Sequence, residues 1–212
     1  MDRTKLRLYA VTDRAWAADG DSFFRQVAAA VAGGADIVQL REKHLDPQAF
    51  LTEAKRFVAL CREQGALSII NDSAEIAAQA GADGVHVGQG DLEASHARAL
   101  LGPDKLIGVS AHTVEEALLA EKQGADYLGV GAVFPTSSKS DVGEMSYETL
   151  KAICKAVSIP VVAIGGISGE NVGKLAGSGI CGVAVISAIY AAKDVKAAAA
   201  DLKTTVKEML RA

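Results

Sequence analysis

The segment Gly124-Ala-Asp-Tyr-Leu-Gly-Val130 decides the fold, because it joins a helix-ending glycine and a turn aspartate to a short apolar run typical of a strand. Gly-Ala-Asp recurs at residues 34–36 and 81–83, each time directly before an apolar run. Gly179-Ile-Cys-Gly182 occupies the matching place before a fourth run. A weak repeat before every second strand is typical of a fourfold arrangement of units with two strands and two helices each.

The whole chain alternates between short β-branched runs and Ala-rich amphipathic stretches. Strands are expected at residues 7–11, 37–40, 67–70, 84–87, 106–109, 127–130, 161–164 and 182–185. Helices are expected near residues 21–33, 47–64, 74–80, 94–101, 113–123, 146–156, 169–177 and 192–210. This alternation predicts parallel strands joined by crossover helices. No strand has the features of a protected edge, so a closed α/β barrel, (β/α)8, is favoured over an open sheet.

Composition limits the classes of function. The 212 residues are enough for one domain, 1–212, and only 5% of them are aromatic, so the core consists mainly of Ala, Val, Ile and Leu. A net charge of −4 without a long basic run argues against nucleic acid, and no apolar run is long enough to cross a membrane. The N-terminus lacks the apolar core of a signal peptide. Three scattered cysteines predict free thiols in a reducing compartment, so a cytoplasmic location is expected.

Polar and charged residues gather where the expected strands end, which is where barrels of this kind place their active sites. Gln39, Arg41 and Lys43 follow the second strand, and strand alternation gives them one orientation and Glu42 the other. Three donors at one strand end suit a polyphosphate. The alternative is a surface ladder of ion pairs with Glu42.

Two carboxylates, Asp72 and Asp91, follow the third and fourth strands. Mg²⁺ typically takes one or two carboxylates together with phosphate oxygens and water, so the pair suits a Mg²⁺ ion bound to a polyphosphate. The alternative is that each aspartate caps the helix after it. The four histidines show no spacing typical of metal ligands.

The sixth strand leads into Pro135 and then into a run of hydroxyl residues that ends on Lys139. Hydroxyls and an ammonium group at a strand end suit anion binding, whereas the alternative is a Ser-rich surface loop. Gly165-Gly166 and Ile186-Ser187 follow the last two strands, where barrels commonly bind a phosphate through backbone N–H groups. Two anion sites suit a transferase that joins two phosphorylated small molecules and releases diphosphate.

These residues resemble the thiamine phosphate synthase family over residues 8–190. The motifs that carry the resemblance are Tyr9-Ala-Val-Thr-Asp13, Gln39-Leu-Arg-Glu-Lys43, Ile70-Asn-Asp72, Gly84-Val-His-Val-Gly-Gln-Gly-Asp91, Ile107-Gly-Val-Ser-Ala-His112, Gly129-Val-Gly-Ala-Val-Phe-Pro-Thr-Ser-Ser-Lys139 and Ala163-Ile-Gly-Gly-Ile167. The resemblance implies a single-domain TIM barrel. It also implies Mg²⁺-dependent transfer of the 4-amino-2-methylpyrimidin-5-ylmethyl group from its diphosphate to 4-methyl-5-(2-phosphoethyl)thiazole. The products would be thiamine phosphate and diphosphate, formed by a dissociative, carbocation mechanism.

The resemblance also implies the site residues. Those for the pyrimidine diphosphate are Gln39, Arg41, Lys43, Asn71, Ser110 and Lys139. Those for the thiazole phosphate are Thr136, Ser137, Ser138, Gly166, Ile186 and Ser187. Asp72 and Asp91 would hold Mg²⁺, and the catalytic cations would be Arg41, Lys43 and Lys139.

The chain departs from the family pattern at Ser73, where the family often has Arg, so one cation near the diphosphate is missing. Three other functions stay open: a thiazole tautomerase, a non-catalytic regulator that binds thiazole phosphate, and a sugar-phosphate epimerase. The sequence leaves the oligomeric state undetermined. It also leaves open the roles of His86, Gln89 and His112, of which His112 either contacts substrate or braces the next helix.

Overall fold

A computed structural model of the chain describes residues 2–88, 91–136 and 145–212, with the backbone alone at residues 91–93. Eight parallel strands pair in chain order and close into a barrel. The strands are β1 (Leu8–Val11), β2 (Ile37–Leu40), β3 (Leu67–Asn71), β4 (Gly84–Val87), β5 (Leu106–Ala111), β6 (Tyr127–Val130), β7 (Val161–Ile164) and β8 (Gly182–Val185). The expected TIM (β/α)8 barrel is therefore confirmed.

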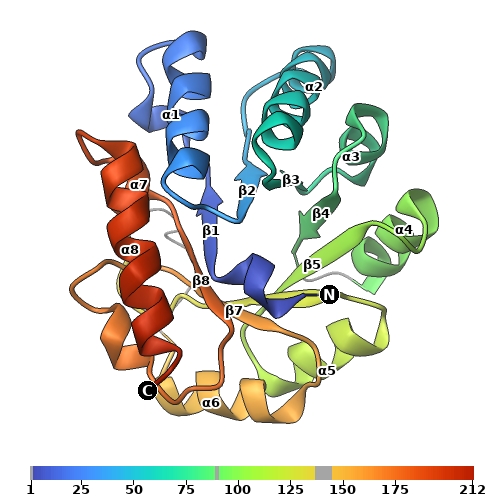
Figure 1. Cartoon of the computed structure of the whole chain (residues 1–212). Helices are drawn as coiled ribbons and strands as arrows, with labels where there is room; N and C mark the ends of the chain where they lie inside the picture. The colour runs from blue at the N-terminus through green and yellow to red at the C-terminus, as the bar shows by residue number, and fades with distance from the viewer. Residues whose placement is uncertain (1, 89–90, 137–144) are drawn as a thin grey trace.

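The α-helices form a ring around this barrel (Figure 1). They are α1 (Gly20–Ala32), α2 (Pro47–Gln64), α3 (Ala74–Ala80), α4 (Asp91–Leu101), α5 (Val114–Lys122), α6 (Tyr147–Ala156), α7 (Ser187–Tyr190) and α8 (Val195–Met209). Three short 3-10 helices are η1 (Arg3–Leu6), η2 (Arg14–Trp16) and η3 (Val172–Leu175). Leu6 of η1 is fully buried against the side chains inside the barrel, so η1 closes the amino-terminal end.

The last third of the chain differs from the sequence prediction in two places. The α-helix expected near residues 169–177 is wrong, because this segment forms only the four-residue η3. Glycines at 169, 173 and 177 lower the helix propensity of the segment. The helix expected near residues 192–210 begins at Val195, where the Asp194 carboxylate accepts a hydrogen bond from the Ala197 N–H at 2.9 Å. The separate helix α7 precedes it.

Alternate residues of each strand build two distinct cores. Inside the barrel lie Leu6, Tyr9, Val11, Ile37, Ile69, Tyr127, Val162 and Ala184. The outward-facing residues, such as Val38 and Leu40 of β2, pack instead against the ring of helices. The barrel interior thus contains two tyrosines, whose polar atoms lie next to these aliphatic side chains.

The Gly-Ala-Asp repeat has a structural role at the amino-terminal end of the barrel. Each aspartate lies just before an even-numbered strand, and its carboxylate accepts a hydrogen bond from a backbone N–H near the start of the preceding strand. The three pairs are Asp36 with Leu8 at 3.3 Å, Asp83 with Ser68 at 2.8 Å and Asp126 with Ile107 at 2.7 Å. In the fourth place, the Cys181 thiol donates to the Val161 carbonyl oxygen at 3.3 Å. The repeat therefore joins strands in pairs.

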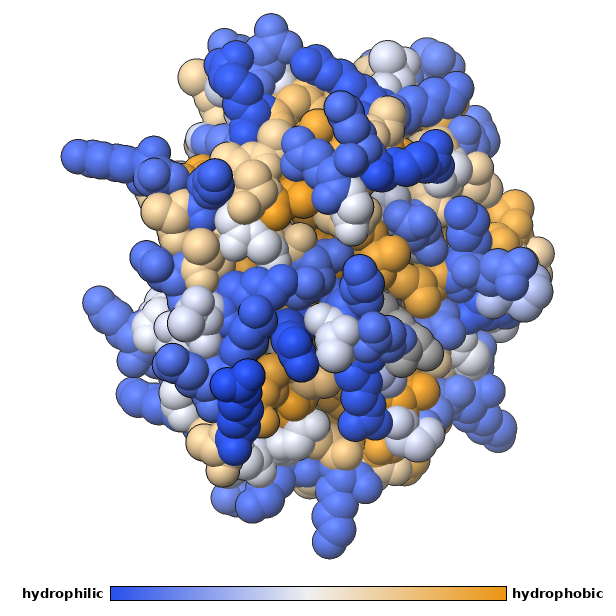
Figure 2. All heavy atoms as spheres, viewed as in Figure 1, coloured by the Kyte–Doolittle hydropathy of each residue, from blue (hydrophilic) through white to orange (hydrophobic). Residues whose placement is uncertain are grey.

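Figure 2 shows hydrophilic side chains over most of the face seen in Figure 1, with apolar side chains in small separate groups. Within the part of the chain that the structure describes, we find no helix with the length and apolar character that crossing a bilayer requires.

Candidate active site

A pocket at the mouth of the barrel extends into the barrel interior, and we call it the polar pocket because polar side chains, mainly from β2 to β5, gather in its lining. Its polar lining consists of Tyr9, Gln39, Arg41, Asn71, Asp72, His86, Ser110 and Tyr127. It brings together four of the six residues predicted for the pyrimidine diphosphate: Gln39, Arg41, Asn71 and Ser110. Of the other two, Lys43 lies at its edge beside Asp72, and Lys139 lies outside the described residues.

Lys43 and Asp72 form an ion pair at the mouth of this pocket, with 2.6 Å between the Lys43 Nζ and the Asp72 Oδ2. Both side chains are about half exposed, so a phosphate can reach them. The Asp72 backbone is left-handed, with a φ of 65°, and its N–H donates to the His86 carbonyl oxygen at 2.8 Å. A left-handed backbone is uncommon for residues other than glycine and, when it occurs, often marks a functional site.

Glu42 faces away from the polar pocket, as strand alternation predicts. Its carboxylate accepts hydrogen bonds from the Arg14 Nη2 at 2.6 Å and the Arg14 Nε at 3.0 Å, and Glu53 contacts the same guanidinium. The hydrogen bond with Glu42 raises the pKa of Arg14. The alternative of an ion-pair ladder of Arg41 and Lys43 with Glu42 is therefore wrong. Within the described residues the Arg41 guanidinium has no carboxylate partner, which leaves its charge for a ligand.

The chemistry of the donors fits a hard divalent ion that takes most of its ligands from substrate and water. No group of three or more His, Cys, Asp and Glu side chains is close enough to hold a metal within residues 2–88, 94–136 and 145–212. Asp72 presents a half-exposed carboxylate beside the cations, whereas Asp91 begins α4 and its side chain lies outside the described atoms. One or two carboxylates suffice for Mg²⁺ when phosphate oxygens supply other ligands.

Ser73, which departs from the family pattern, caps a helix. Its hydroxyl oxygen accepts a hydrogen bond from the Ile76 N–H at 3.2 Å, at the start of α3. This contact satisfies a backbone donor that would otherwise lack a partner in the first helical turn. Ser73 therefore has a local structural role in place of the missing cation.

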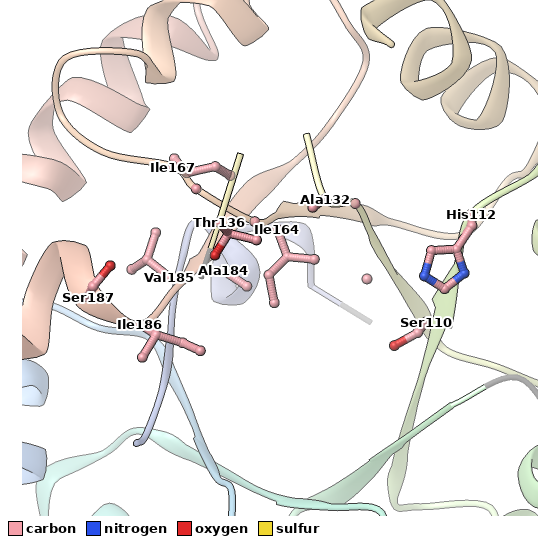
Figure 3. Close-up of a pocket in the computed structure, with 14 residues that line it drawn as sticks. Ser110, His112, Ala132, Thr136, Ile164, Ile167, Ala184, Val185, Ile186 and Ser187 are labelled. Carbon is pink, nitrogen blue, oxygen red and sulfur yellow. The ribbon is translucent and has the colours of Figure 1, made fainter. Parts of the chain in front are cut away.

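A second pocket adjoins the first at the ends of β6 to β8, and we call it the glycine pocket. Its lining includes Gly131, Ala132, Gly165 and Gly166, together with four residues predicted for the thiazole phosphate: Thr136, Gly166, Ile186 and Ser187. The other two, Ser137 and Ser138, lie outside the described residues. Figure 3 shows Ser110 and His112 on one side of the glycine pocket and Ile186 and Ser187 on the other.

The backbone gives the glycine pocket its shape. The Val133 N–H donates to the Ile164 carbonyl oxygen at 3.0 Å, and the Phe134 N–H donates to the Gly165 carbonyl oxygen at 3.1 Å. These bonds hold the segment after β6 against the end of β7. Gly166 has a φ of 62°, and a Cβ there would lie 2.3 Å from the Pro135 carbonyl oxygen. Only glycine fits this approach between the two segments.

Asn171 was missed by sequence reasoning, and it braces the loop after β7. Its side-chain Nδ2 donates to the Gly166 carbonyl oxygen at 2.8 Å, while its Oδ1 accepts from the Ser168 N–H at 2.8 Å. An asparagine five residues after a Gly-Gly pair carries no strong sequence signal, because many asparagines serve turns.

His112 braces the next helix, which was one of the two roles left open for it. The Glu116 carboxylate accepts from the His112 backbone N–H at 2.6 Å and lies 3.1 Å from the His112 Nδ1. The ring also lines the glycine pocket, so bracing α5 leaves it in reach of a ligand.

A chain of hydrogen bonds inside the barrel was also missed. It runs through Gln39, Tyr9, Tyr127, His86 and Ser110, and the successive distances between their polar atoms are 2.6, 2.9, 3.2 and 3.1 Å. Burial raises the pKa of both tyrosines well above its ordinary value, so their hydroxyls stay protonated at neutral pH. The sequence holds only a weak signal for this chain: two tyrosines and a histidine at inward strand positions.

The two pockets share one wall. Ser110, Gly129, Ile164, Ala184 and Ile186 line both of them. Two small ligands bound in these pockets would therefore lie side by side, without a structural element between them.

Comparison with known proteins shows the family of the chain. A family model described as thiamine monophosphate synthase matches residues 8–189. A thiamine-phosphate synthase of Clostridium tetani is 48% identical over 195 residues, which cover 92% of this chain and 93% of that protein. Thiamine-phosphate synthase 2 of Streptococcus pneumoniae is 45% identical over 197 residues, covering 93% of each chain.

Solved structures agree as well. A thiamine phosphate pyrophosphorylase from Pyrococcus furiosus superposes with a TM-score of 0.88 at 39% identity, over 98% of both chains. A 3-hexulose-6-phosphate synthase superposes with a TM-score of 0.67 at 20% identity over 94% of this chain, which shows a shared fold alone. The family match and the identity to curated relatives extend over almost the whole chain, and the chain therefore belongs to the thiamine-phosphate synthase family of transferases.

Proposed function

We propose that this transferase joins 4-amino-5-hydroxymethyl-2-methylpyrimidine diphosphate to 4-methyl-5-(2-phosphoethyl)thiazole, with release of diphosphate. The observation that carries the proposal is the pair of adjoining pockets with different chemistry and a shared wall. One pocket offers the Arg41 and Lys43 cations and the Asp72 carboxylate, as a diphosphate with a metal ion requires. The other offers backbone and hydroxyl groups, as a single phosphate requires.

The polar pocket would hold the pyrimidine diphosphate. Gln39, Asn71 and Ser110 would bind and orient it, while Arg41, Lys43 and Lys139 would stabilise the negative charge on the departing diphosphate. Asp72 and Asp91 would hold a Mg²⁺ ion, which would supply further positive charge to the diphosphate oxygens. Breaking the C–O bond leaves a resonance-stabilised pyrimidinylmethyl cation.

The glycine pocket would hold the thiazole phosphate next to that cation. Thr136, Ser187 and the backbone at Gly166 and Ile186 would bind its phosphate, with Ser137 and Ser138 contributing further hydroxyls. The thiazole nitrogen then attacks the cation and forms the new C–N bond. Catalysis on this scheme consists of positioning and charge stabilisation, and it requires no general base from the protein.

The competing functions use only part of the site. A tautomerase, a regulator or an epimerase would use the glycine pocket for a phosphate, but would leave Arg41 and the Lys43–Asp72 pair without a ligand. We also propose a cytoplasmic location, because the structure records Cys61, Cys154 and Cys181 as free thiols.

A coupling assay tests the proposed function. The protein is incubated with the pyrimidine diphosphate and the thiazole phosphate in Mg²⁺ buffer, and both diphosphate and thiamine phosphate are measured. We expect the two products in equal amounts, and only when both substrates are present. Diphosphate release at the same rate without the thiazole would indicate a hydrolase and contradict the proposal.

A further inference from the structure

A third cavity lies at the amino-terminal end of the barrel, opposite the two pockets of the candidate site. It forms where η1, dark blue in Figure 1, meets the end of α8 and the segment before β8. Its volume is about 280 Å³, against about 90 Å³ for the polar pocket and about 70 Å³ for the glycine pocket. We call it the basic cavity, because its lining contains no carboxylate but four cations: Arg3, Arg7, Lys207 and Arg211.

The charges of these four cations are not neutralised by the described part of the chain, in which none of them forms an ion pair. Arg3 donates to a carbonyl oxygen, that of Ser158, at 3.0 Å. Asp2 does not line the cavity, because its carboxylate accepts from the Thr4 N–H at 2.9 Å and from the Thr4 hydroxyl at 2.8 Å. The end of α8 adds only a partial negative charge, about half of one unit.

The Gly-Ala-Asp repeat shows where a carboxylate would be expected at this end of the barrel. In two of its three places the aspartate also pairs with a cation: Asp36 with the Lys203 Nζ, and Asp126 with the Arg98 Nη2, each at 2.7 Å. In the fourth place Cys181 stands at the position of the aspartate, and it lines the basic cavity. Burial raises the pKa of the Cys181 thiol to about 11, so it carries no charge at neutral pH. The four cations therefore lie where the repeat supplies no carboxylate.

We propose that the basic cavity is a second ligand site, which binds a small molecule that carries a diphosphate group. Three of the four cations are arginines, whose planar guanidinium groups bind phosphate oxygens in pairs. Four positive charges suit a diphosphate better than a single phosphate, because the diphosphate carries more negative charge. The bound ligand would also join η1 to the end of α8, and it would stabilise the folded protein by binding to it alone.

Titration calorimetry of the full chain with inorganic diphosphate tests this site. Diphosphate is also the proposed product, so the titration uses the Arg41→Gln/Lys43→Gln protein, in which the polar pocket has lost two cations. A chelator removes divalent ions, and low ionic strength limits the screening of the remaining charges. We expect this protein to bind one diphosphate per chain.

Arg7→Gln and Lys207→Gln, each added to that protein, remove one cation of the basic cavity. We expect each to weaken diphosphate binding by about tenfold or more, as expected for the loss of a hydrogen bond between charged groups. Lys196→Gln is the matched control, because it removes the same charge from an exposed position at the other end of α8. It should leave the affinity unchanged. Citrate, an anion with carboxylates in place of phosphates, should bind more weakly than diphosphate.

Absence of binding, or equal affinities of the Arg7→Gln, Lys207→Gln and Lys196→Gln proteins, would overturn the site. Equal affinity for citrate would overturn the diphosphate class of the ligand. If Arg7→Gln prevents folding, Lys207→Gln decides alone, because the Lys207 side chain is partly exposed. In an otherwise wild-type chain, Lys207→Gln should leave the coupling reaction unchanged, since the basic cavity lies at the far end of the barrel. A failure of the proposed function is distinct, because the wild-type protein would then form no thiamine phosphate.

Discussion

The polar pocket and the glycine pocket share one wall, yet they differ in the groups that line them. Side chains form most of the first, and backbone forms most of the second. The polar pocket uses charged and amide side chains at the ends of β2 to β5, including Arg41 and Asp72. The glycine pocket uses the backbone at the ends of β6 to β8, where Gly165 and Gly166 have left-handed conformations. A side chain can move with a leaving group, whereas the backbone that lines the glycine pocket keeps one conformation.

This difference matches the proposed roles of the two ligands. The diphosphate departs during the reaction and its charge changes, so mobile cations suit it. The phosphate of the thiazole takes no part in the bond changes, so a fixed cradle suits it. The pockets should therefore respond differently to metal removal and to substitution, which offers four ways to test the comparison.

The largest effect is expected from removal of Mg²⁺, which should affect the polar pocket alone. A chelator should abolish diphosphate release, and added Mg²⁺ should restore it, because the two carboxylates and the diphosphate need a shared counter-ion. Binding of the thiazole phosphate, measured by titration calorimetry, should survive the chelator. Turnover that continues unchanged in the chelator would eliminate the metal assignment.

Lys139→Ala should lower turnover by about 10²-fold or more, as expected for the loss of a group that stabilises charge in the transition state. Lys139 lies outside the described residues, so kinetics must test its role. Lys155→Ala, at an exposed lysine in the last turn of α6, is the control and should have no effect. Near-normal turnover of Lys139→Ala would show that the lysine only lines a loop.

Gly166→Val should raise the KM of the thiazole phosphate by about tenfold or more and change that of the pyrimidine diphosphate little, because a Cβ would push Pro135 away from the loop. Gly169→Val is the matched control: no atom lies within 4 Å of its added Cβ. If the KM of the pyrimidine diphosphate rises instead, the two pockets have been assigned the wrong way round.

Asn171→Asp should give the smallest effect. Aspartate can still accept from the Ser168 N–H, but it cannot donate to the Gly166 carbonyl oxygen. Loss of one hydrogen bond, about 1 kcal/mol, should raise the KM of the thiazole phosphate about fivefold. An equal rise for both substrates would show that Asn171 supports the whole barrel mouth rather than the cradle.

The strands were predictable because each is a short apolar run, and the start of the Pro47–Gln64 helix was predictable because Asp46 and Pro47 are local signals. The prediction near residues 169–177 was wrong because buried contacts of Val172 and Leu175 produce apolar spacing in a glycine-rich turn. At the site, the location of Gln39, Arg41, Asn71 and Ser110 around one pocket was predictable from their places at strand ends.

The bond between Tyr9 and Tyr127 was not predictable, since it joins residues 118 positions apart in the sequence. Partners at that separation meet only when the barrel closes, and no local pattern records them. The contact of Arg14 with Glu42 and Glu53 could not be predicted for the same reason, because it joins three separate segments of the chain.

The repeated aspartates at the amino-terminal end of the barrel carry a consequence for the order of folding. Their hydrogen bonds join residues only 28, 15 and 19 positions apart in the sequence. Each two-strand unit can therefore form early in folding, because closing so short a loop costs little conformational entropy. Lys203 of α8 contacts Asp36 across 167 residues. That bond can form only when the last helix packs against the first two-strand unit. It is therefore a contact that forms late in folding, when the barrel closes.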